Sequence, residues 1–151
     1  MSDTESIMLA LSTSRQSMKT AEFAIERAKE GKKLIIAFVV DVNLARYFVG
    51  AELGLYPELK ERCKEELLKE YRSRAAEKIS SIVKTAEDYG ISVKIYMSTG
   101  RFALECLEAM RKEDPKLIIT TRSKRPNWAK KFSDSPIDYL IASAGCPVLE
   151  V

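Results

Sequence analysis

The chain has 151 residues, enough for one domain with a sizeable core, and 46% hydrophobic beside 31% charged residues is typical of a soluble globular protein. A net charge of +3 does not by itself indicate a nucleic-acid-binding protein. The absence of histidine excludes Ser-His-Asp and Cys-His catalysis and histidine metal ligands, so we assign no catalytic residue and no metal site. No apolar run approaches the about 20 residues that span a bilayer. The acidic start MSDTES is unlike a signal peptide, so we expect a cytoplasmic protein without membrane contact.

The first third of the chain predicts two buried strands around one helix. Residues 7–12 form a short apolar run without a helical face, which is typical of a buried strand. Met18, Ala21, Ile25 and Ala28 then recur at helical spacing until Gly31. Residues 34–40 are hydrophobic throughout, as in a parallel strand that is covered on both faces.

A long helix is predicted in the middle of the chain. The apolar segment 42–56 precedes it and could be a lid, a partner surface or a cover for the core, of which we favour the last. Pro57 suits the first helical turn, and one apolar stripe continues to Ala86 before Gly90. About 33 residues at 1.5 Å each measure roughly 50 Å, so we expect one end to project.

The last third predicts three more strands and two helices. Residues 93–98 alternate in polarity, as at a sheet edge, and a helix follows Gly100 and ends before Pro115. Residues 116–121 are a fourth strand and 147–151 a fifth, on either side of a helix that a capping box at Ser135 and Asp138 would open. We expect its inward side chains to be Ile137, Leu140, Ile141 and Ala144. Strict alternation of strands and helices predicts one α/β domain, residues 1–151, with a parallel sheet covered on both faces.

Three segments are similar to motifs of one known family. The ending AGCPVLEV (144–151) resembles the close A-P-C-P-V-L-V-V of universal stress proteins, and FVVD (38–41) resembles their H-V-V-D. The segment STGRFALECLEAM (98–110) resembles the one that begins V-x-G-D-P-A. The similarity covers the whole chain. It implies a doubly wound, Rossmann-like domain with a five-stranded parallel sheet of order 3-2-1-4-5, a role in the stress response and a homodimer.

The family's ATP motif, G-x-x-G-(nine residues)-G-S/T, is degenerate in this sequence. Alignment on the ending places Thr121, Lys124 and Asp134 at the three glycine positions, and only the closing hydroxyl, Ser135, matches. Ser12 stands where the family's adenine-directed aspartate is expected. Side chains at the glycine positions block close backbone approach to a phosphate, and a carboxylate at 134 repels one. We therefore expect no ATP binding in the family manner and assign no cofactor.

The candidate site for an altered nucleotide or a simple anion comprises residues at the strand ends: Ser12, Val39, Val40, Thr121, Arg122, Lys124 and Ser135. The segment STSRQSMKT (12–20) could also hold an anion with Arg15, although a helix N-cap with solvated serines is the favoured interpretation. Five cations and Trp128 between residues 122 and 131 form either an anion or nucleic-acid surface or a solvated loop.

These observations predict a binding or regulatory protein of the stress response. The first alternative is a nucleotide- or anion-binding protein with a rearranged phosphate loop and slow ATP hydrolysis. The second is a nucleic-acid-associated protein using residues 122–131, which the small net charge disfavours. In the implied strand order the fifth strand is an edge, and an apolar edge invites pairing. We expect the homodimer to form there, through Val148, Leu149 and Val151.

Overall fold

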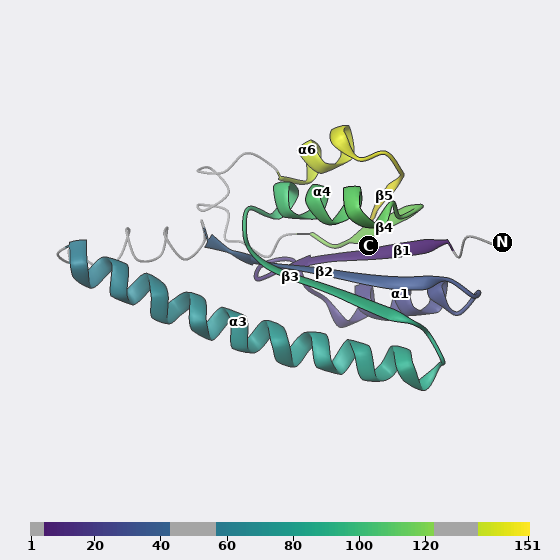
Figure 1. Ribbon diagram of the computed structural model, residues 1–151, viewed down its shortest axis with the longest axis horizontal. Coiled ribbons are helices and arrows are strands. Elements are labelled where there is room, and N and C mark those ends of the chain that lie inside the picture. Colours follow the sequence, from purple (N-terminus) through teal and green to yellow (C-terminus); the bar gives the residue numbers. More distant parts are fainter. Residues whose placement is uncertain (1–4, 43–56, 123–135) are drawn as a thin grey trace.

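The computed structural model describes residues 5–42, 57–122 and 136–151, in which strands and helices alternate along the chain (Figure 1). The strands are β1 Ser6–Ser12, β2 Lys33–Asp41, β3 Val93–Gly100, β4 Leu117–Thr120 and β5 Val148–Glu150. The helices are α1 Met18–Ala28, α3 Pro57–Asp88, α4 Phe102–Glu113 and α6 Pro136–Ser143.

The five strands form one parallel sheet in the order β3-β2-β1-β4-β5, which confirms the predicted topology. β1 lies at the centre, where Leu9 is in register with Ile36 of β2 on one side and Ile119 of β4 on the other. All seven residues of β1 are buried, because a central parallel strand is covered by helices on both faces.

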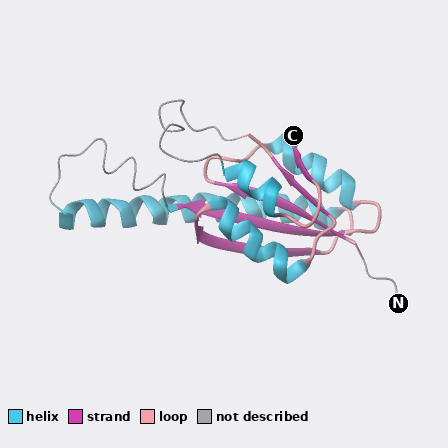
Figure 2. Cartoon of the chain, turned by 90° about the horizontal axis from the view of Figure 1, so that it is seen from above, coloured by secondary structure: helices cyan, strands magenta, loops and turns pink. Residues whose placement is uncertain are grey.

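The helices form one layer on each face of the sheet. Figure 1 shows α4 and α6 above the sheet and α1 and α3 below it, and Figure 2 shows the same layers from above. Side chains alternate between the two layers along each strand. Leu9, Ile36 and Phe38 pack with α1 and α3, whereas Met8 and Ile35 pack with α4 and α6. The continuous hydrophobicity of β1 and β2 is the sequence signal for these two cores.

Helix α3 is longer than the sheet that it covers. Its 32 residues correspond to about 48 Å, and its described buried side chains run from Leu68 to Ala86. The amino-terminal end of α3 therefore extends past the sheet, as Figure 1 shows, and the predicted projection is confirmed. The predicted covering segment 42–56 lies outside the described residues except for Val42, which packs against the α1–α3 core.

Several side chains that the periodicity predicted to face inward are exposed. Ile141 of α6 is exposed because this short helix buries Leu140 instead. Met18 is exposed at the start of α1. On β3, which is confirmed as an edge strand, Ile95 and Met97 are 47% and 40% exposed. Periodicity identifies one face of a strand or helix but does not say how far the covering layer extends.

Glu113 connects the end of α4 to the neighbouring strands β2 and β3. Its carboxylate accepts hydrogen bonds from Lys33 Nζ at 3.4 Å and Lys94 Nζ at 3.1 Å, and its side chain is only 10% exposed. Burial acts to raise the pKa of Glu113, but the hydrogen bonds from these lysines outweigh it and lower the pKa. The two ammonium groups also offset the unfavourable placement of a carboxylate at a helix carboxyl end.

We expect Glu113→Gln to lower the free energy of unfolding by about 1 kcal/mol at neutral pH, because both lysines lose a charged acceptor. The folded-state pKa is lowered, so this contribution is present above the ordinary glutamate pKa of about 4.3 and is lost as pH falls through the folded value. Urea unfolding of both proteins between neutral and acidic pH measures it. Glu108→Gln, which removes an exposed pair with Arg111 on the same helix, is the control and should change stability by less than about 0.5 kcal/mol. A gap between wild type and Glu113→Gln that persists below pH of about 2 would contradict this assignment.

Candidate functional site

The strand order places a crevice between the carboxyl ends of β1 and β4. From β1 the chain continues through α1 to β2 on one side, whereas β4 and β5 lie on the other side. In open parallel sheets, ligands bind where the strand order reverses in this way, because the loops that follow the two strands turn apart. Here β1 ends at Ser12 and β4 ends at Thr120, so their following loops define the candidate site.

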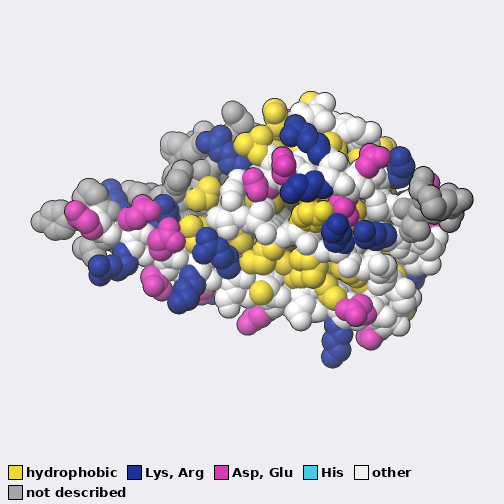
Figure 3. All heavy atoms as spheres, in the orientation of Figure 1, with side chains coloured by type: hydrophobic (Ala, Val, Ile, Leu, Met, Phe, Trp, Pro, Cys, Tyr) yellow, Lys and Arg dark blue, Asp and Glu magenta, His cyan; other side chains and the backbone are white. Residues whose placement is uncertain are grey.

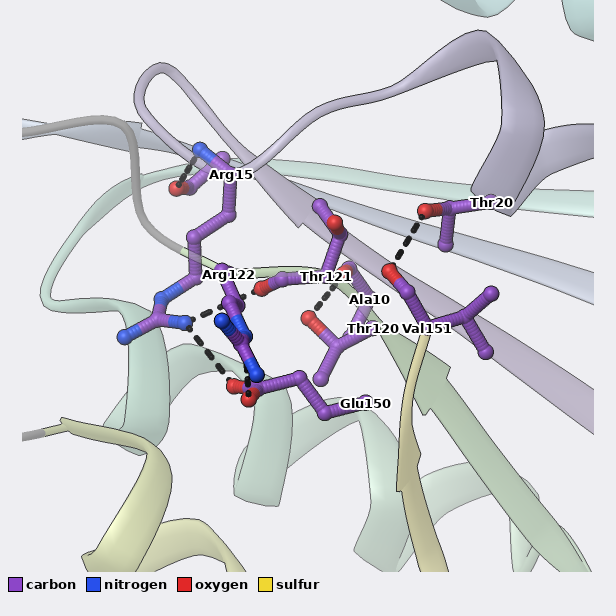
Figure 4. Close-up of polar contacts among 9 residues, drawn as sticks. Ala10, Arg15, Thr20, Thr120, Thr121, Arg122, Glu150 and Val151 are labelled. Atoms are coloured by element: carbon purple, nitrogen blue, oxygen red, sulfur yellow. Dashed lines mark hydrogen bonds and ion pairs between the residues drawn. The ribbon is translucent and has the colours of Figure 1, made fainter.

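The side chain of Arg15 fills the described part of this crevice. Arg15 is only 4% exposed although it follows the end of β1 by three residues. Its Nη1 donates a hydrogen bond to the carbonyl oxygen of Thr121 at 3.0 Å and lies 3.8 Å from Oε2 of Glu150 (Figure 4). The guanidinium carbon also lies 5.1 Å from the ring centroid of Phe102 at the start of α4. Arg15 thus connects the loop after β1 to β4, β5 and α4.

A tight turn after β1 aims Arg15 into the crevice. The backbone N–H of Ser12 donates to the carbonyl of Arg15 at 2.9 Å, and the N–H of Arg15 donates to Oγ of Ser12 at 3.1 Å. The neighbouring hydroxyl of Thr13 accepts a hydrogen bond from the N–H of Asp41, which fixes the turn to the end of β2. The predicted N-cap with solvated serines is therefore wrong for Ser12 and Ser14, which are buried. Ser17 does occupy the N-cap of α1, without a side-chain capping bond.

The carboxylate of Glu150 forms ion pairs with two arginines. Glu150 is in β5 with its side chain 34% exposed, and Oε2 lies 3.8 Å from Nη1 of Arg15 and Oε1 lies 3.7 Å from Nε of Arg122 (Figure 4). The two arginines differ in environment, since the side chain of Arg122 is 90% exposed. Burial lowers the pKa of Arg15 and the charge of Glu150 opposes that shift. An arginine in a protein remains a cation even when it is buried, so Glu150 supplies the counter-charge that the Arg15 guanidinium requires.

Threonine hydroxyls fix the strands around the crevice. Thr120 Oγ1 donates to the carbonyl of Ala10 at 2.8 Å, which joins β4 to the central strand. The N–H of Val151 donates to the carbonyl of Thr120, and Thr20 Oγ1 of α1 donates to the carbonyl oxygen of Val151 at 3.2 Å. These two bonds hold the backbone of Val151, the neighbour of Glu150, against β4 and α1.

The structure brings three of the predicted site residues to the crevice. Ser12 is buried and bonded within its own turn, Thr121 is buried and bonded through its carbonyl to Arg15, and Arg122 is exposed at the rim. Val39 and Val40 are both buried and pack into opposite layers, so at most one of them faces any single pocket. Lys124 and Ser135 lie outside the described residues. Their assignment to a nucleotide or anion site stays a prediction.

Two residues of this arrangement were not identified as partners from the sequence. The sequence suggests Arg15 for an anion site and not as a buried side chain, and it places Glu150 only in an edge strand. An acidic residue within an otherwise apolar terminal strand, PVLEV, is the available signal, because a carboxylate in such a strand is a candidate partner for a buried cation.

The three cysteines differ in how deeply they are buried. Cys63, Cys106 and Cys146 are free thiols. Cys106 is fully buried near Arg15, and burial raises the pKa of its thiol well above the usual value despite that positive charge. Within residues 5–42, 57–122 and 136–151, no group of three His, Cys, Asp or Glu side chains is arranged to hold a metal ion. The helices of this same part of the chain include none that is long and apolar enough to cross a membrane.

The sheet order and the crevice define a doubly wound α/β protein. The chain belongs to the universal stress protein family, whose family model matches residues 4–151. It is 30% identical over 146 residues to universal stress protein MJ0531 of Methanocaldococcus jannaschii, an alignment that covers 96% of this chain and 80% of that protein. The predicted family is thus confirmed.

Solved structures of lower identity share the fold. Universal stress protein UspA from Lactobacillus plantarum matches with a TM-score of 0.71 and 16% identity over 99% of both chains. A universal stress protein family protein from Arabidopsis thaliana matches with a TM-score of 0.55 and 11% identity, over 97% of this chain and 90% of that one. At these identities the likeness shows a common fold only.

We expect Arg15→Ala to lower the free energy of unfolding by about 2–3 kcal/mol, because it removes a buried hydrogen bond and leaves Glu150 without its inner partner. Arg122→Ala removes an exposed partner of the same carboxylate and should cost less than about 1 kcal/mol. Urea unfolding of the two variants at equal ionic strength compares them. If both variants lose less than about 1 kcal/mol of the free energy of unfolding, Arg15 does not stabilise the crevice more than Arg122 does.

Proposed function

We propose that this protein is a cytoplasmic binding or regulatory protein of the stress response that does not bind ATP in the manner of its ATP-binding relatives. The observation that supports this proposal is the burial of Arg15. A side chain of the protein occupies the described part of the crevice where a sheet of this topology takes its ligands, and its charge is already neutralised by Glu150. The protein's partners would then contact its surface instead of entering the sheet's ligand crevice.

The chemistry of the crevice is unfavourable for a triphosphate. A phosphate that approached Arg15 would have to displace Glu150 and the carbonyl of Thr121, or accept a carboxylate as a neighbour. Repulsion between two anions at such a distance is strong in a partly buried site. The loop after β4 also lacks the glycines that let backbone N–H groups approach a phosphate.

The first alternative, a nucleotide- or anion-binding protein with slow ATP hydrolysis, is favoured by one observation. The guanidinium of Arg122 is exposed at the rim of the crevice, so it could pair with an anion from solvent without a rearrangement of the fold. Two proteins of similar fold have been solved with cAMP and with AMP, respectively. The second alternative, a nucleic-acid surface on residues 122–131, lies outside the described residues except for Arg122.

We propose further that the protein forms a homodimer through β5. This strand is an edge of the sheet, and Leu149 and Val151 are each 37% exposed. Val148 is half-buried and packs into the α4–α6 core, so its contribution would be to hold the strand in place. Antiparallel pairing of two β5 strands about a two-fold axis would satisfy the free backbone edge and cover both exposed side chains.

We expect equilibrium dialysis with Mg-ATP to give a dissociation constant no tighter than about 1 mM, which corresponds to roughly 4 kcal/mol of binding free energy. The physical reasons are the filled crevice and the missing glycines. Binding in the micromolar range would overturn this proposal and favour the alternative of a rearranged nucleotide site.

We expect Leu149→Lys to weaken the β5 dimer, because two lysines would be placed in one strand-to-strand interface. Leu149→Val retains an apolar edge and is the matched control. Sedimentation velocity at tens of micromolar protein, a concentration equivalent to about 6 kcal/mol of association, measures both variants. If the two variants sediment alike, β5 is not the interface.

A further inference from the structure

The second edge of the sheet, β3, exposes a band of hydrophobic side chains. Figure 1 views the molecule with β3 toward the reader, and Figure 3, in the same orientation, shows hydrophobic side chains gathered where β3 runs, between charged groups of the helical layers. Ile95 and Met97 are the exposed large hydrophobic residues of this strand. An edge strand with exposed apolar residues offers unpaired N–H and C=O groups beside a hydrophobic surface, which favours pairing with another strand.

The usual protection of an edge strand is weak in β3. Charged residues, proline or a bulge commonly prevent the edge strands of two molecules from pairing. The sequence VKIYMSTG has one charged residue and no proline. That residue, Lys94, is held by Glu113 at 3.1 Å, and its Nζ lies 5.5 Å from the ring centroid of Tyr96. The ammonium group is thus drawn toward Glu113 within the protomer, and β3 itself has no second charged residue to repel a copy of the strand.

We propose that β3 binds a second copy of this chain by antiparallel pairing centred on Tyr96. In that register Tyr96 meets its own symmetry mate, and Ile95 of each protomer lies opposite Met97 of the other on the α1–α3 face. Lys94 lies opposite Ser98, so the two lysines are kept apart. The strand is therefore self-complementary, as a two-fold interface requires, over nearly its whole length.

Helix α3 supplies the additional area that such a dimer needs. A pair of eight-residue strands buries less than the roughly 800 Å² per protomer of a standard interface. The two-fold axis would place both α3 helices on the same face of the extended sheet and antiparallel to each other. α3 is fastened to β3 by the hydrogen bond from Arg72 Nε to Thr99 Oγ1 at 3.2 Å. Ile95 and Met97 would then fill the space between the two helices.

This surface is distinct from the β5 edge, which lies at the opposite side of the sheet. A protein that pairs through both edges would form a dimer at low concentration and larger species at high concentration, because two different two-fold interfaces do not close on a dimer. The two interfaces can be removed separately by single substitutions.

Disulfide trapping tests the register. We expect Tyr96→Cys to form a covalent dimer under mild oxidation, because cross-strand Cα atoms at directly opposed positions are about 4.5–5.5 Å apart, within disulfide range. Ser98→Cys is the matched control on the same edge and face, since its symmetry mate would be about 13 Å away at 3.3 Å per residue. Both are compared with wild type on a non-reducing gel to account for the native thiols. No covalent dimer of Tyr96→Cys, or equal trapping of both variants, would overturn the proposal.

A second set of variants tests the β3 interface by sedimentation velocity, without cysteine substitutions and with the β5 interface removed. We expect Leu149→Lys to retain a β3 dimer at about 100 μM, and Met97→Lys in the same background to weaken association at least about tenfold. Circular dichroism verifies that each variant is folded. If folded Leu149→Lys is monomeric at that concentration while wild type is dimeric, β3 is not an interface and β5 alone accounts for the dimer. If Met97→Lys leaves the association of Leu149→Lys unchanged, the β3 proposal is also overturned.

Discussion

A guanidinium buried where the strand order reverses is the constraint on which the rest of the crevice depends. The strand order reverses between β1 and β4, which is where parallel sheets commonly bind ligands, and the buried side chain of Arg15 lies at this point. A buried cation needs polar partners, and here they are the carbonyl of Thr121, which accepts a hydrogen bond, and the carboxylate of Glu150, which forms an ion pair. The buried guanidinium therefore needs a carboxylate nearby, and Glu150 of the last strand supplies it.

That requirement explains why β5 has an acidic residue in a strand that is otherwise apolar. Glu150 faces the α4–α6 side of the sheet, where Arg15 lies, and Leu149 faces the other side, in register with Ile119. The same short strand thus has two roles on two faces. One side chain neutralises the crevice, and its neighbours form the exposed edge. A substitution at Glu150 would affect both the crevice and the order of the edge, whereas one at Leu149 would affect only the edge.

The sequence predicted the fold well because local and global signals agree. The unbroken hydrophobic runs of β1 and β2 indicate strands covered on both faces, and the stripe from Leu59 to Ala86 indicates a helix too long for its sheet. The site was less predictable. Arg15 and Thr121 are 106 positions apart, and nothing in the local pattern of either residue identifies the other. The exposure of Ile95 and Ile141 also depends on where a neighbouring layer stops, which hydrophobic periodicity does not encode.

A filled crevice and two apolar edges together shift the expected function from the interior of the sheet to its margins. In a doubly wound sheet the strand ends offer a ligand site, and the outer strands offer hydrogen-bonding groups that the fold itself does not use. When a side chain of the protein already occupies the site at the strand ends, the outer strands are the sites that remain for a partner. β3 and β5 differ in length and in chemistry, since β3 presents Ile95 and Met97 and β5 presents Leu149 beside the acid that holds the crevice. A partner at β5 would therefore be coupled through Glu150 to the occupant of the crevice, whereas a partner at β3 would not.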